Sequence, residues 1–330
     1  MKKILIIQTA SIGDVILATP LLEKLHYMYE DANIDFLLKR GNESLFTNHP
    51  FINQLIVWDK KTSKYKNLFN IVKQIRKTKY DLVINIQRFL SSGIITVLSG
   101  AKETIGFDKN PASMFFTKKI IHKIGKEYKG IHEIDRNLEL LAHLDCDKKF
   151  TVKLYPSEGD YANVNGYKSN KYLCVAPASL WQTKQYPAVK WIEFINAVPP
   201  AYTIYLLGSN ADITLCDEIK DTSTYTDIVN LAGKLTMLES AALMKDATMN
   251  YVNDSAPLHL TSSMNAKVTA IFCSTVTDFG FGPLADDSVV VETTEKLNCR
   301  PCGLHGYREC PEKHFKCAMT INKQQLLARI

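Results

Sequence analysis

The feature that most constrains the fold of this chain is a regular alternation between short apolar runs and longer segments of helical length. The short runs are rich in β-branched residues, as buried strands are, and most segments between them have helical periodicity. This alternation predicts parallel β-sheets covered by helices on both faces, an α/β fold. The predicted strands are residues 3–9, 34–39, 54–59, 81–87, 172–178, 203–208, 227–231, 247–253 and 268–273.

The length and one polar stretch predict how the chain is divided. At 330 residues the chain suits two domains of ordinary size better than one core. The stretch YPSEGDYANVNGYKSNK, residues 155–171, is polar and poor in aliphatic residues, which is typical of a linker. We therefore predict two Rossmann-like domains facing a central cleft. The predicted parts are a first domain at 1–155, a linker at 156–170 and a second domain beginning at 171.

Composition and the N-terminus indicate a folded protein without a targeting segment. Hydrophobic residues make up 46% of the chain and charged residues 22%, which is typical of globular domains and not of disordered ones. No run approaches the ~20 apolar residues that span a bilayer. The apolar N-terminal run is broken by Gln8 and Asp14 and lacks a small-residue cleavage site, which argues against a signal peptide. We expect a cytoplasmic protein.

Positive charge is concentrated in residues 60–79, which contain eight Lys or Arg residues and no acid. If residues 65–79 form a helix, its apolar side chains fall on one stripe and its lysines on the opposite side. Two interpretations stay open. The lysines form either an ordinary solvated face or a landing site for an anionic partner such as a phosphorylated lipid surface. The apolar stripe consists of Leu68, Ile71, Val72 and Ile75.

The stretch QTASIGDVILATP, residues 8–20, contains an acid where the first strand gives way to a helix. Ligands of parallel sheets gather at the carboxyl ends of the strands, so Asp14, with Ser11 and Gly13 beside it, is expected to face the ligand site. The alternative is a helix cap, because Asp accepts backbone N–H bonds at helix N-termini. The loop lacks the G-x-G-x-x-G of dinucleotide-binding proteins, which tells against an ordinary NAD-dependent dehydrogenase.

The stretch APASLWQTKQYP, residues 176–187, carries polar groups suited to a diphosphate in a strand-to-helix loop. Lys184 supplies a point charge, and Ser179 and Thr183 supply hydroxyls that donate hydrogen bonds. An ordinary solvated loop would have a similar composition, and that interpretation stays open at this point.

Two further stretches of the second half extend this pattern. In YVNDSAPLHLTSSM, residues 251–264, Asp254 is suited to sugar hydroxyls, and the helix that begins near Ser255 offers an anion site. In YLLGSNAD, residues 205–212, Asp212 follows a glycine turn and is suited to a ribose hydroxyl. For each stretch the alternative is structural: Ser255 and Asp212 cap helices and His259 packs.

Four motifs together, in this order, resemble glycosyltransferase family 9, the ADP-heptose:lipopolysaccharide heptosyltransferases, over nearly the whole chain. The resemblance implies a GT-B fold with an N-terminal acceptor domain, a C-terminal nucleotide-sugar domain at 171–317, and a helix at 318–330 that returns to the first domain. It also implies inverting transfer of heptose from ADP-heptose to an anionic inner-core acceptor, without a metal, at the cytoplasmic face of the inner membrane. The motifs are IQTASIGDVILATPLLEKL, ASLWQTKQYP, NDSAPLHLTSSM and VTAIFCSTVTDFGFGP.

The resemblance also implies roles for individual residues. Asp14 matches the base that takes the proton of the acceptor hydroxyl. Lys184 matches a cation that stabilises the diphosphate leaving group, and Asp254 matches the acid that contacts the donor sugar. The sequence DSA at 254–256 replaces the family's DTG, so another hexose or heptose nucleotide stays open as donor. The remaining donor-side positions are Ser179, Thr183, Asp212 at the ribose, Leu235 near the adenine, Ser255, Ala256 and His259.

Half of the eight cysteines lie in one short segment, CRPCGLHGYRECPEKHFKC, residues 299–317. In a cytoplasmic chain the spacing C-x2-C-x7-C-x6-C is typical of a structural zinc site, with disulfides or free thiols as alternatives. His305 and His314 lie inside the segment and are suited to replace one thiolate. We expect no catalytic role for these residues. The predicted ligands are Cys299, Cys302, Cys310 and Cys317.

Two other functions remain as alternatives. A nucleotide-sugar epimerase shares the predicted fold, because fold alone does not fix function. A basic protein with a four-cysteine zinc knuckle is a more distant alternative, since such proteins bind nucleic acid. No recognised nucleic-acid-binding motif accompanies the cysteines, so we expect no nucleic-acid partner.

Overall fold

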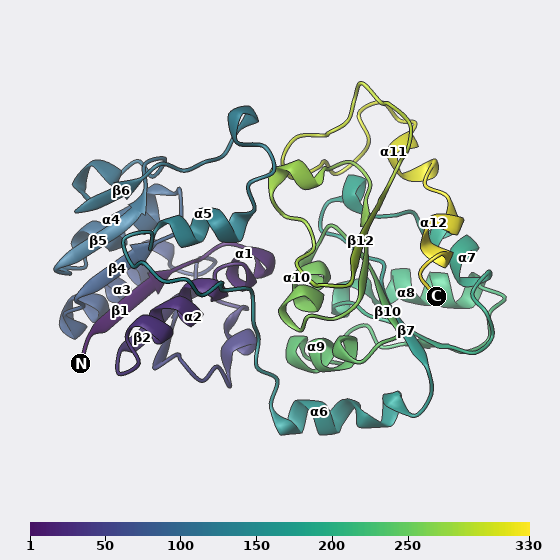
Figure 1. The fold of residues 1–330 in the computed structure, drawn as a ribbon, viewed down its shortest axis with the longest axis horizontal. Helices are drawn as coiled ribbons and strands as arrows, with labels where there is room; N and C mark the ends of the chain where they lie inside the picture. Colours follow the sequence, from purple (N-terminus) through teal and green to yellow (C-terminus); the bar gives the residue numbers. More distant parts are fainter. The chain divides into compact units, whose positions relative to one another are not determined.

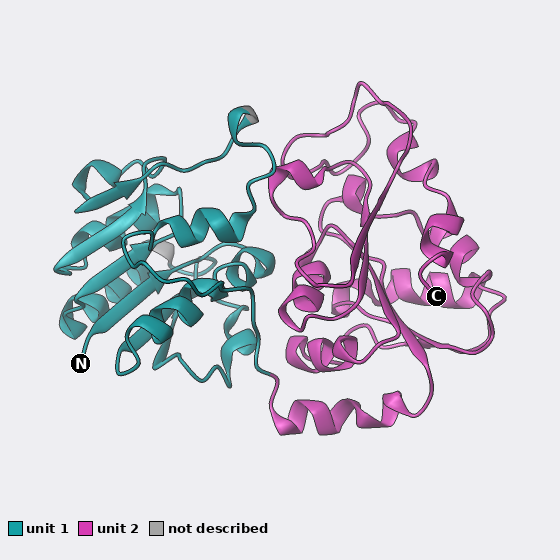
Figure 2. Ribbon diagram, in the orientation of Figure 1, with its two compact units in different colours: residues 1–155 teal, residues 156–330 magenta. Residues whose placement is uncertain are grey.

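The protein consists of two compact units, residues 1–155 and residues 156–330 (Figure 2). The computed structural model describes the backbone of all 330 residues and the side chains of all except Lys64 and Lys126. Each unit contains one six-stranded parallel sheet, which confirms the predicted α/β fold.

Unit 1 holds a sheet with the strand order β3-β2-β1-β4-β5-β6 (Figure 1). Its strands are β1 (Lys3–Ile7), β2 (Asn33–Lys39), β3 (Gln54–Trp58), β4 (Leu82–Asn85), β5 (Glu103–Phe107) and β6 (Lys118–Ile120). Its α-helices are α1 (Ile12–Ile16), α2 (Thr19–Met28), α3 (Lys64–Thr78), α4 (Leu90–Leu98) and α5 (Glu133–Glu139).

Unit 2 holds a sheet with the order β12-β11-β10-β7-β8-β9. Its strands are β7 (Tyr172–Ala176), β8 (Thr203–Leu206), β9 (Ile228–Asn230), β10 (Met249–Asn253), β11 (Val268–Phe272) and β12 (Ser288–Glu292). Its α-helices are α6 (Glu158–Val164), α7 (Ala188–Ile195), α8 (Ile213–Thr222), α9 (Met237–Lys245), α10 (Ala256–Ser263), α11 (Lys316–Met319) and α12 (Lys323–Leu327).

The two sheets have the same topology. In each, the first strand of the unit lies between the second and the fourth, as β1 lies between β2 and β4, and β7 between β8 and β10. The chain therefore reverses its direction of winding between β1 and β4 in unit 1, and between β7 and β10 in unit 2. Such switch points are where parallel sheets bind ligands, at the carboxyl ends of the strands.

The central strands are continuous apolar runs because both faces of each sheet are buried. Leu5 and Ile7 of β1 pack with α3 in one core, and the intervening Ile4 and Ile6, also fully buried, point to the opposite face of the sheet. The predicted stripe of the basic helix is confirmed: Ile75 is fully buried, and Ile71 and Val72 are nearly so. The basic side of α3 is left facing away from this core.

Three strands escaped the sequence analysis: β5, β6 and β12. All three lie toward one edge of their sheets and are less continuously apolar than the central strands. Gly106 lowers the strand signal of β5, yet it is needed there, because a Cβ at this position would lie 2.6 Å from the Phe116 ring.

Two predicted parts are corrected by the structure. Residues 156–170 are not an extended linker, because α6 and the 3₁₀ helix that follows it pack in unit 2, where Lys168 forms a 2.6 Å ion pair with Asp246. The terminal segment 318–330 completes the core of unit 2: Leu326 is fully buried beside Tyr251, whose hydroxyl donates to the Leu326 carbonyl. Figure 1 shows α12 beside α7.

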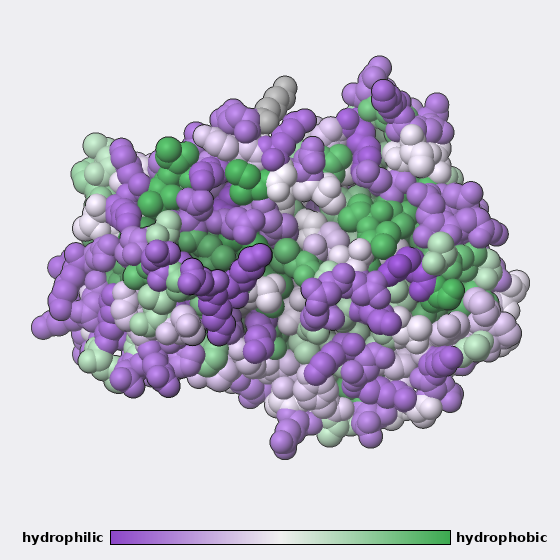
Figure 3. Space-filling model, in the orientation of Figure 1, coloured by the Kyte–Doolittle hydropathy of each residue, from purple (hydrophilic) through white to green (hydrophobic). Residues whose placement is uncertain are grey.

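Hydrophilic side chains cover most of the face drawn in Figure 3, with hydrophobic residues in separate patches. Among the helices of the described residues, none is long and apolar enough to cross a membrane.

Candidate active site

An ion pair marks the switch point of unit 2. Lys184 ends the 3₁₀ helix Gln182–Lys184 that follows β7, and its Nζ lies 2.7 Å from Oδ2 of Asp254, which follows β10. The two strands are neighbours in register, with Val252 opposite Ala176, so the chain leaves both at the same level. Both side chains are largely buried, at 15% and 7% exposed. The sheet thus brings together two residues that are distant in sequence.

Asn253 holds the two loops of this switch point together. Its side-chain oxygen accepts from the Tyr186 N–H at 3.0 Å, and its amide nitrogen donates to the Pro177 carbonyl at 2.8 Å. Asn253 is fully buried. The sequence analysis missed this residue, because a buried Asn at a strand end resembles any other polar loop residue.

Asp254 has a second partner on the loop after β11. The Thr275 hydroxyl donates to the same Oδ2 atom at 2.6 Å. Held by a cation and a hydroxyl on one oxygen, the carboxylate has a fixed orientation and retains lone pairs for a ligand hydroxyl. Lys184 has three donors on Nζ, so it can bind an anion while it contacts Asp254.

Of the other predicted donor-side residues on these loops, Ser179, Ser255 and Ala256 are partly exposed, and His259 is buried. Ser179 follows β7, and its N–H donates to the Gln185 side chain at 3.1 Å. Ser255 is the N-cap residue of α10, and Ala256 begins the helix. His259 lies one turn into α10 and is nearly buried at 5% exposed. Roles for these residues in donor binding stay predictions.

Thr183 is buried and bonded within the protein. Its hydroxyl accepts from the Tyr307 N–H at 2.7 Å and from the Ser274 hydroxyl at 3.1 Å. It also lies 3.2 Å from the Tyr307 carbonyl. The side chain is 2% exposed, and its hydroxyl is bonded to other groups of the protein. Its neighbour Lys184 faces Asp254 instead.

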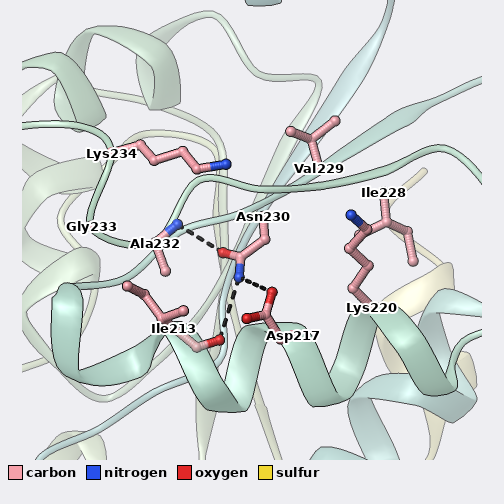
Figure 4. A pocket seen from close by; sticks show the side chains of 9 residues that line it. All are labelled: Ile213, Asp217, Lys220, Ile228, Val229, Asn230, Ala232, Gly233 and Lys234. Carbon is pink, nitrogen blue, oxygen red and sulfur yellow. Dashed lines mark hydrogen bonds between the residues drawn. The ribbon is translucent and has the colours of Figure 1, made fainter.

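Asp212 forms a capping box, in agreement with the structural alternative. Its Oδ2 accepts from both the N–H and the hydroxyl of Ser209 at 2.7 Å. Leu235 is half-buried and directly follows Lys234, which lines a cavity of about 400 Å³ beside α8. Figure 4 shows Asn230 in this cavity, with its amide bonded to Asp217. Contacts of Asp212 and Leu235 with a nucleotide stay predictions.

In unit 1, Asp14 lies in the first turn of α1, after β1. Its carboxylate accepts from the Ser11 N–H at 3.1 Å and from the Ser11 hydroxyl, which forms a capping box. Gly13 between them is buried. Asp14 thus takes part in capping, as the third residue of a helix whose N-cap is Ser11. A cap does not exclude a chemical role, because Asp14 is only half-buried.

Glu133 and Arg136 of α5 form a buried ion pair near Asp14 that the sequence analysis did not single out. Arg136 Nη1 lies 2.5 Å from Glu133 Oε2, and both side chains are largely buried. Burial raises the pKa of Glu133, the Arg136 guanidinium opposes this rise, and the Asp14 carboxylate adds to it. The influence of Asp14 indicates that the two acids are near each other. No motif links them, because they are far apart in sequence.

The switch point of unit 1 contains neutral amides and a lysine. The Thr9 hydroxyl donates to Gln87 at 3.1 Å, and the Gln87 amide donates to Gln8. Lys60 Nζ donates to both the carbonyl and the hydroxyl of Thr9 at 2.8 Å. Gln8 and Thr9 lie in the stretch at residues 8–20, and Lys60 opens the basic segment, but the sequence did not indicate that these residues and Gln87 come together.

The four clustered cysteines line one cavity of about 220 Å³ together with His314. All four are free thiols, and Cys299 Sγ lies 4.0 Å from His314 Nε2. Burial and the neighbouring thiols raise the pKa of Cys317 to about 11 and also raise that of Cys302. Among the side chains that the structure describes, no three metal-ligand residues stand in a preassembled coordination group.

Comparisons with known proteins give the family. Residues 68–313 match the family model of glycosyltransferase family 9 (heptosyltransferase). The chain is 29% identical to lipopolysaccharide heptosyltransferase 3 of Escherichia coli, over 80% of this chain and 81% of that protein.

Two solved structures share the fold. A family 9 glycosyltransferase from Veillonella parvula superposes with a TM-score of 0.84 at 21% identity and covers 99% of this chain and 95% of its own. E. coli ADP-heptose lps heptosyltransferase II superposes with a TM-score of 0.81 at 18% identity. The match covers 100% of this chain and 97% of that structure's chain. The two parallel sheets thus form a GT-B fold. Because the family model spans well over half of its residues, this chain belongs to glycosyltransferase family 9 and is a glycosyltransferase.

Proposed function

We propose that this chain transfers a heptose from ADP-heptose to an inner-core acceptor of lipopolysaccharide, with inversion and without a catalytic metal ion. The observation that carries this proposal is the Lys184–Asp254 pair at the switch point of unit 2. It supplies a cation for a diphosphate and an oriented carboxylate for a sugar. The names of the E. coli relatives support the choice of heptose, of ADP and of lipopolysaccharide.

In the proposed reaction, Lys184 stabilises the leaving group. As the bond between the anomeric carbon and the diphosphate oxygen breaks, its electron pair stays on ADP and adds negative charge there. The Lys184 ammonium and the Ser179 hydroxyl are suited to that charge, and so are the N–H groups at the start of α10, by Ser255 and Ala256. Asp254 is proposed to hold hydroxyls of the donor sugar.

Asp14 is proposed as the general base. It accepts the proton of the acceptor hydroxyl while that oxygen attacks the anomeric carbon from the face opposite ADP, which inverts the configuration. In the free enzyme the carboxylate accepts two bonds from Ser11. The acceptor hydroxyl would replace or share the bond from the Ser11 side chain. The nearby Glu133 and Arg136 would set the charge around the base.

We propose that α3 contacts an anionic surface, the lipopolysaccharide precursor or the cytoplasmic face of the inner membrane. Its exposed side carries lysines together with Phe69, which is 70% exposed, and Tyr65, which is 79% exposed. Cations beside exposed aromatic rings suit a lipid interface. Cosedimentation with phosphatidylglycerol vesicles but not with phosphatidylcholine vesicles is expected. Equal or absent binding to both would contradict the proposal.

A structural zinc ion is proposed for the cysteine cluster. The four thiols line one cavity, and a divalent cation would displace their protons and bind the sulfurs as thiolates. The side chains would have to turn inward to bind it, with His314 able to replace one thiolate. Elemental analysis of protein purified without a metal-affinity tag should give close to one zinc per chain. Metal-free, fully folded protein would contradict the proposal.

A donor screen tests the main proposal. Purified protein is incubated with ADP-, UDP- and GDP-sugars, with and without truncated lipopolysaccharide, and nucleotide release is followed. ADP release from ADP-heptose that requires the acceptor is expected, and the product linkage should have the inverted configuration. Conversion of the donor sugar without an acceptor would indicate an epimerase instead.

The same assay tests the role of metals. In excess EDTA, initial rates over a short assay are expected to stay at their full value, because Lys184 and the helix N-terminus replace Mg²⁺ at the diphosphate. An immediate loss that Mg²⁺ restores would contradict the proposed mechanism.

A further inference from the structure

The cysteine segment, residues 299–317, packs directly against the loop that carries Lys184. The Thr183 N–H donates to the Tyr307 carbonyl at 3.1 Å, and the Tyr307 N–H donates to the Thr183 hydroxyl at 2.7 Å. These reciprocal bonds fix Thr183 to Tyr307 although the two are far apart in sequence. The sequence analysis treats the cysteines as separate from the donor site, whereas the structure brings the two together.

Gly306 permits this close approach. It has a φ of +76°, which favours glycine, and a Cβ there would lie 2.8 Å from the Thr183 hydroxyl and 3.0 Å from Cγ of Lys184. The cysteine segment therefore contacts the stem of the lysine itself as well as the residue before it. A side chain as small as that of alanine would displace one of them.

The same segment also fixes the loop that orients Asp254. The Cys302 N–H donates to the Ser274 carbonyl at 2.8 Å, and the largely buried Arg300 guanidinium donates to the Thr275 carbonyl at 2.7 Å. Thr275 is the residue whose hydroxyl bonds Asp254. The Ser274 hydroxyl in turn donates to Thr183. One segment thus braces both members of the ion pair, through separate contacts.

We propose that the cysteine segment positions the Lys184–Asp254 pair for the donor, and that Thr183 is the positioning residue through which it acts on Lys184. This inference rests on the proposed role of Lys184 in diphosphate binding. A lysine side chain has many rotamers, so its ammonium is held in place only if its backbone and stem are fixed. The bonds of Thr183 fix the backbone, and Gly306 lies against the stem.

This proposal changes the predicted role of Thr183. Its hydroxyl already bonds Tyr307 and Ser274, and its side chain is buried. A direct bond to a donor phosphate would require breaking these contacts. Thr183 therefore acts on donor binding through its neighbour, and a variant that keeps the hydroxyl is expected to keep most of the effect.

The test compares two substitutions that differ in the hydroxyl. Thr183→Val keeps the shape and removes the hydroxyl, and Thr183→Ser keeps the hydroxyl. ADP affinity of the whole chain is measured by calorimetry, with the melting temperature as a check on folding. Thr183→Val is expected to weaken ADP binding about tenfold, the scale of one or two lost hydrogen bonds. Thr183→Ser is expected to bind ADP with nearly the affinity of the unchanged protein, because it keeps the hydroxyl.

A double-mutant cycle separates positioning from a general effect on unit 2. If Thr183 acts through Lys184, Thr183→Val added to Lys184→Ala causes no further loss of ADP affinity. A loss that adds fully to that of Lys184→Ala would overturn the proposal, and so would unchanged affinity in Thr183→Val alone. Lys184→Ala with the affinity of the unchanged protein would instead contradict the proposed function. The two failures are thus distinguishable.

Gly306→Ala provides a second route if Thr183→Val lowers the melting temperature too far for the comparison. Its methyl group acts on Thr183 and on the stem of Lys184 from the cysteine segment. The same weakening of ADP binding is expected, and it should again vanish in the Lys184→Ala background. A full effect that persists in that background would contradict the proposal.

Discussion

The two units share one sheet topology but differ in the chemistry of their switch points. In unit 1, Thr9 and Gln87 form a neutral hydrogen bond between the ends of β1 and β4, with Lys60 bonded to Thr9. In unit 2, the corresponding loops after β7 and β10 meet in the Lys184–Asp254 ion pair. The topology therefore determines where a ligand binds, and the loops determine which ligand it is.

The two units also hold their acids differently. Asp14 accepts its bonds from Ser11 three residues away, so its position depends on one turn of a short helix. Asp254 is held by partners from two other loops. A locally held carboxylate can exchange its partners at low cost, which suits a base. A carboxylate fixed by tertiary contacts suits binding and orientation. The difference predicts that substitutions in the two units affect different steps.

The largest expected effect is that of Asp14→Asn. Turnover should fall about 100-fold or more, the usual scale for loss of a general base, while the KM for the donor changes little. Steady-state kinetics measure both. Asp160→Asn is the matched control, because Asp160 forms the same capping box with Ser157 in unit 2. Similar turnover in the two variants would reduce Asp14 to a helix cap and remove the functional contrast between the units.

Lys184→Ala should have the next largest effect. Loss of the cation is expected to raise the donor KM and lower kcat together, with kcat/KM down by about 10- to 100-fold, because the charge acts in the ground state and in the transition state. Lys168→Ala removes a comparable ion pair of unit 2, at 2.6 Å from Asp246, and serves as control. Equal effects of the two substitutions would show that the switch point has no special role.

Cys302→Ser is expected to have a smaller effect, a loss of stability confined to unit 2. Loss of the clustered thiol is expected to lower the melting temperature by at least about 2–4 °C, the shift that about 1 kcal/mol causes in a domain of this size. ADP affinity should fall with it, because Cys302 lies in the segment that braces the donor loops. Cys146→Ser in unit 1, outside the cluster, is the control. An unchanged melting temperature with unchanged ADP affinity would contradict the proposed link between the cysteine segment and the donor loops.

The smallest expected effect is a difference in pH sensitivity. Burial lowers the pKa of His49 to about 3 and that of His122 to about 4, both in unit 1. Since these values lie below the unfolded value of 6.5, the unfolded state takes up protons first as the pH falls. The free energy of unfolding of unit 1 therefore decreases below about pH 6.5, by up to about 1.4 kcal/mol per pH unit and histidine.

Hydrogen exchange resolved by peptide measures this difference. Exchange rates at pH 5 and pH 7.5 are corrected for the intrinsic rates, which gives the free energy of opening for each peptide. Between pH 7.5 and pH 5, this free energy should decrease more in peptides of unit 1 than in those of unit 2. His122→Phe is the matched variant, because the histidine ring already stacks on Phe107 at 4.1 Å and a phenyl ring takes up no proton. The variant should lose part of the acid sensitivity. An equal response of both units would contradict the assignment.

The central strands could be predicted from the sequence, because buried parallel strands are continuous apolar runs. The strands β5, β6 and β12 could not, because charged residues or a glycine interrupt their short apolar runs. The linker prediction failed at α6, whose polar surface resembles a loop while Val164 is buried in unit 2. The terminal helices were expected on the first domain by resemblance, yet Leu326 completes the core of the second.

Candidate site residues could be singled out where they lie in sequence motifs, but contacts between residues distant in sequence could not be predicted. The loops of Asp14, Lys184 and Asp254 follow strands in recognisable stretches, so they could be singled out. The bond of Thr183 to Tyr307 joins residues far apart in sequence, and no pattern indicates it. The approach of Asp14 to Glu133 is likewise a product of the fold. The sequence indicated which residues to examine, but not that the Thr183 hydroxyl is bonded to Tyr307 and Ser274.

Calorimetric titration of ADP into the unchanged protein, Asp14→Asn and Lys184→Ala tests most directly the claim that unit 2 binds the nucleotide and unit 1 supplies the base. The account predicts that Asp14→Asn binds ADP as the unchanged protein does, whereas Lys184→Ala binds at least about tenfold more weakly. Full affinity in Lys184→Ala, or an equal loss in both variants, would contradict it.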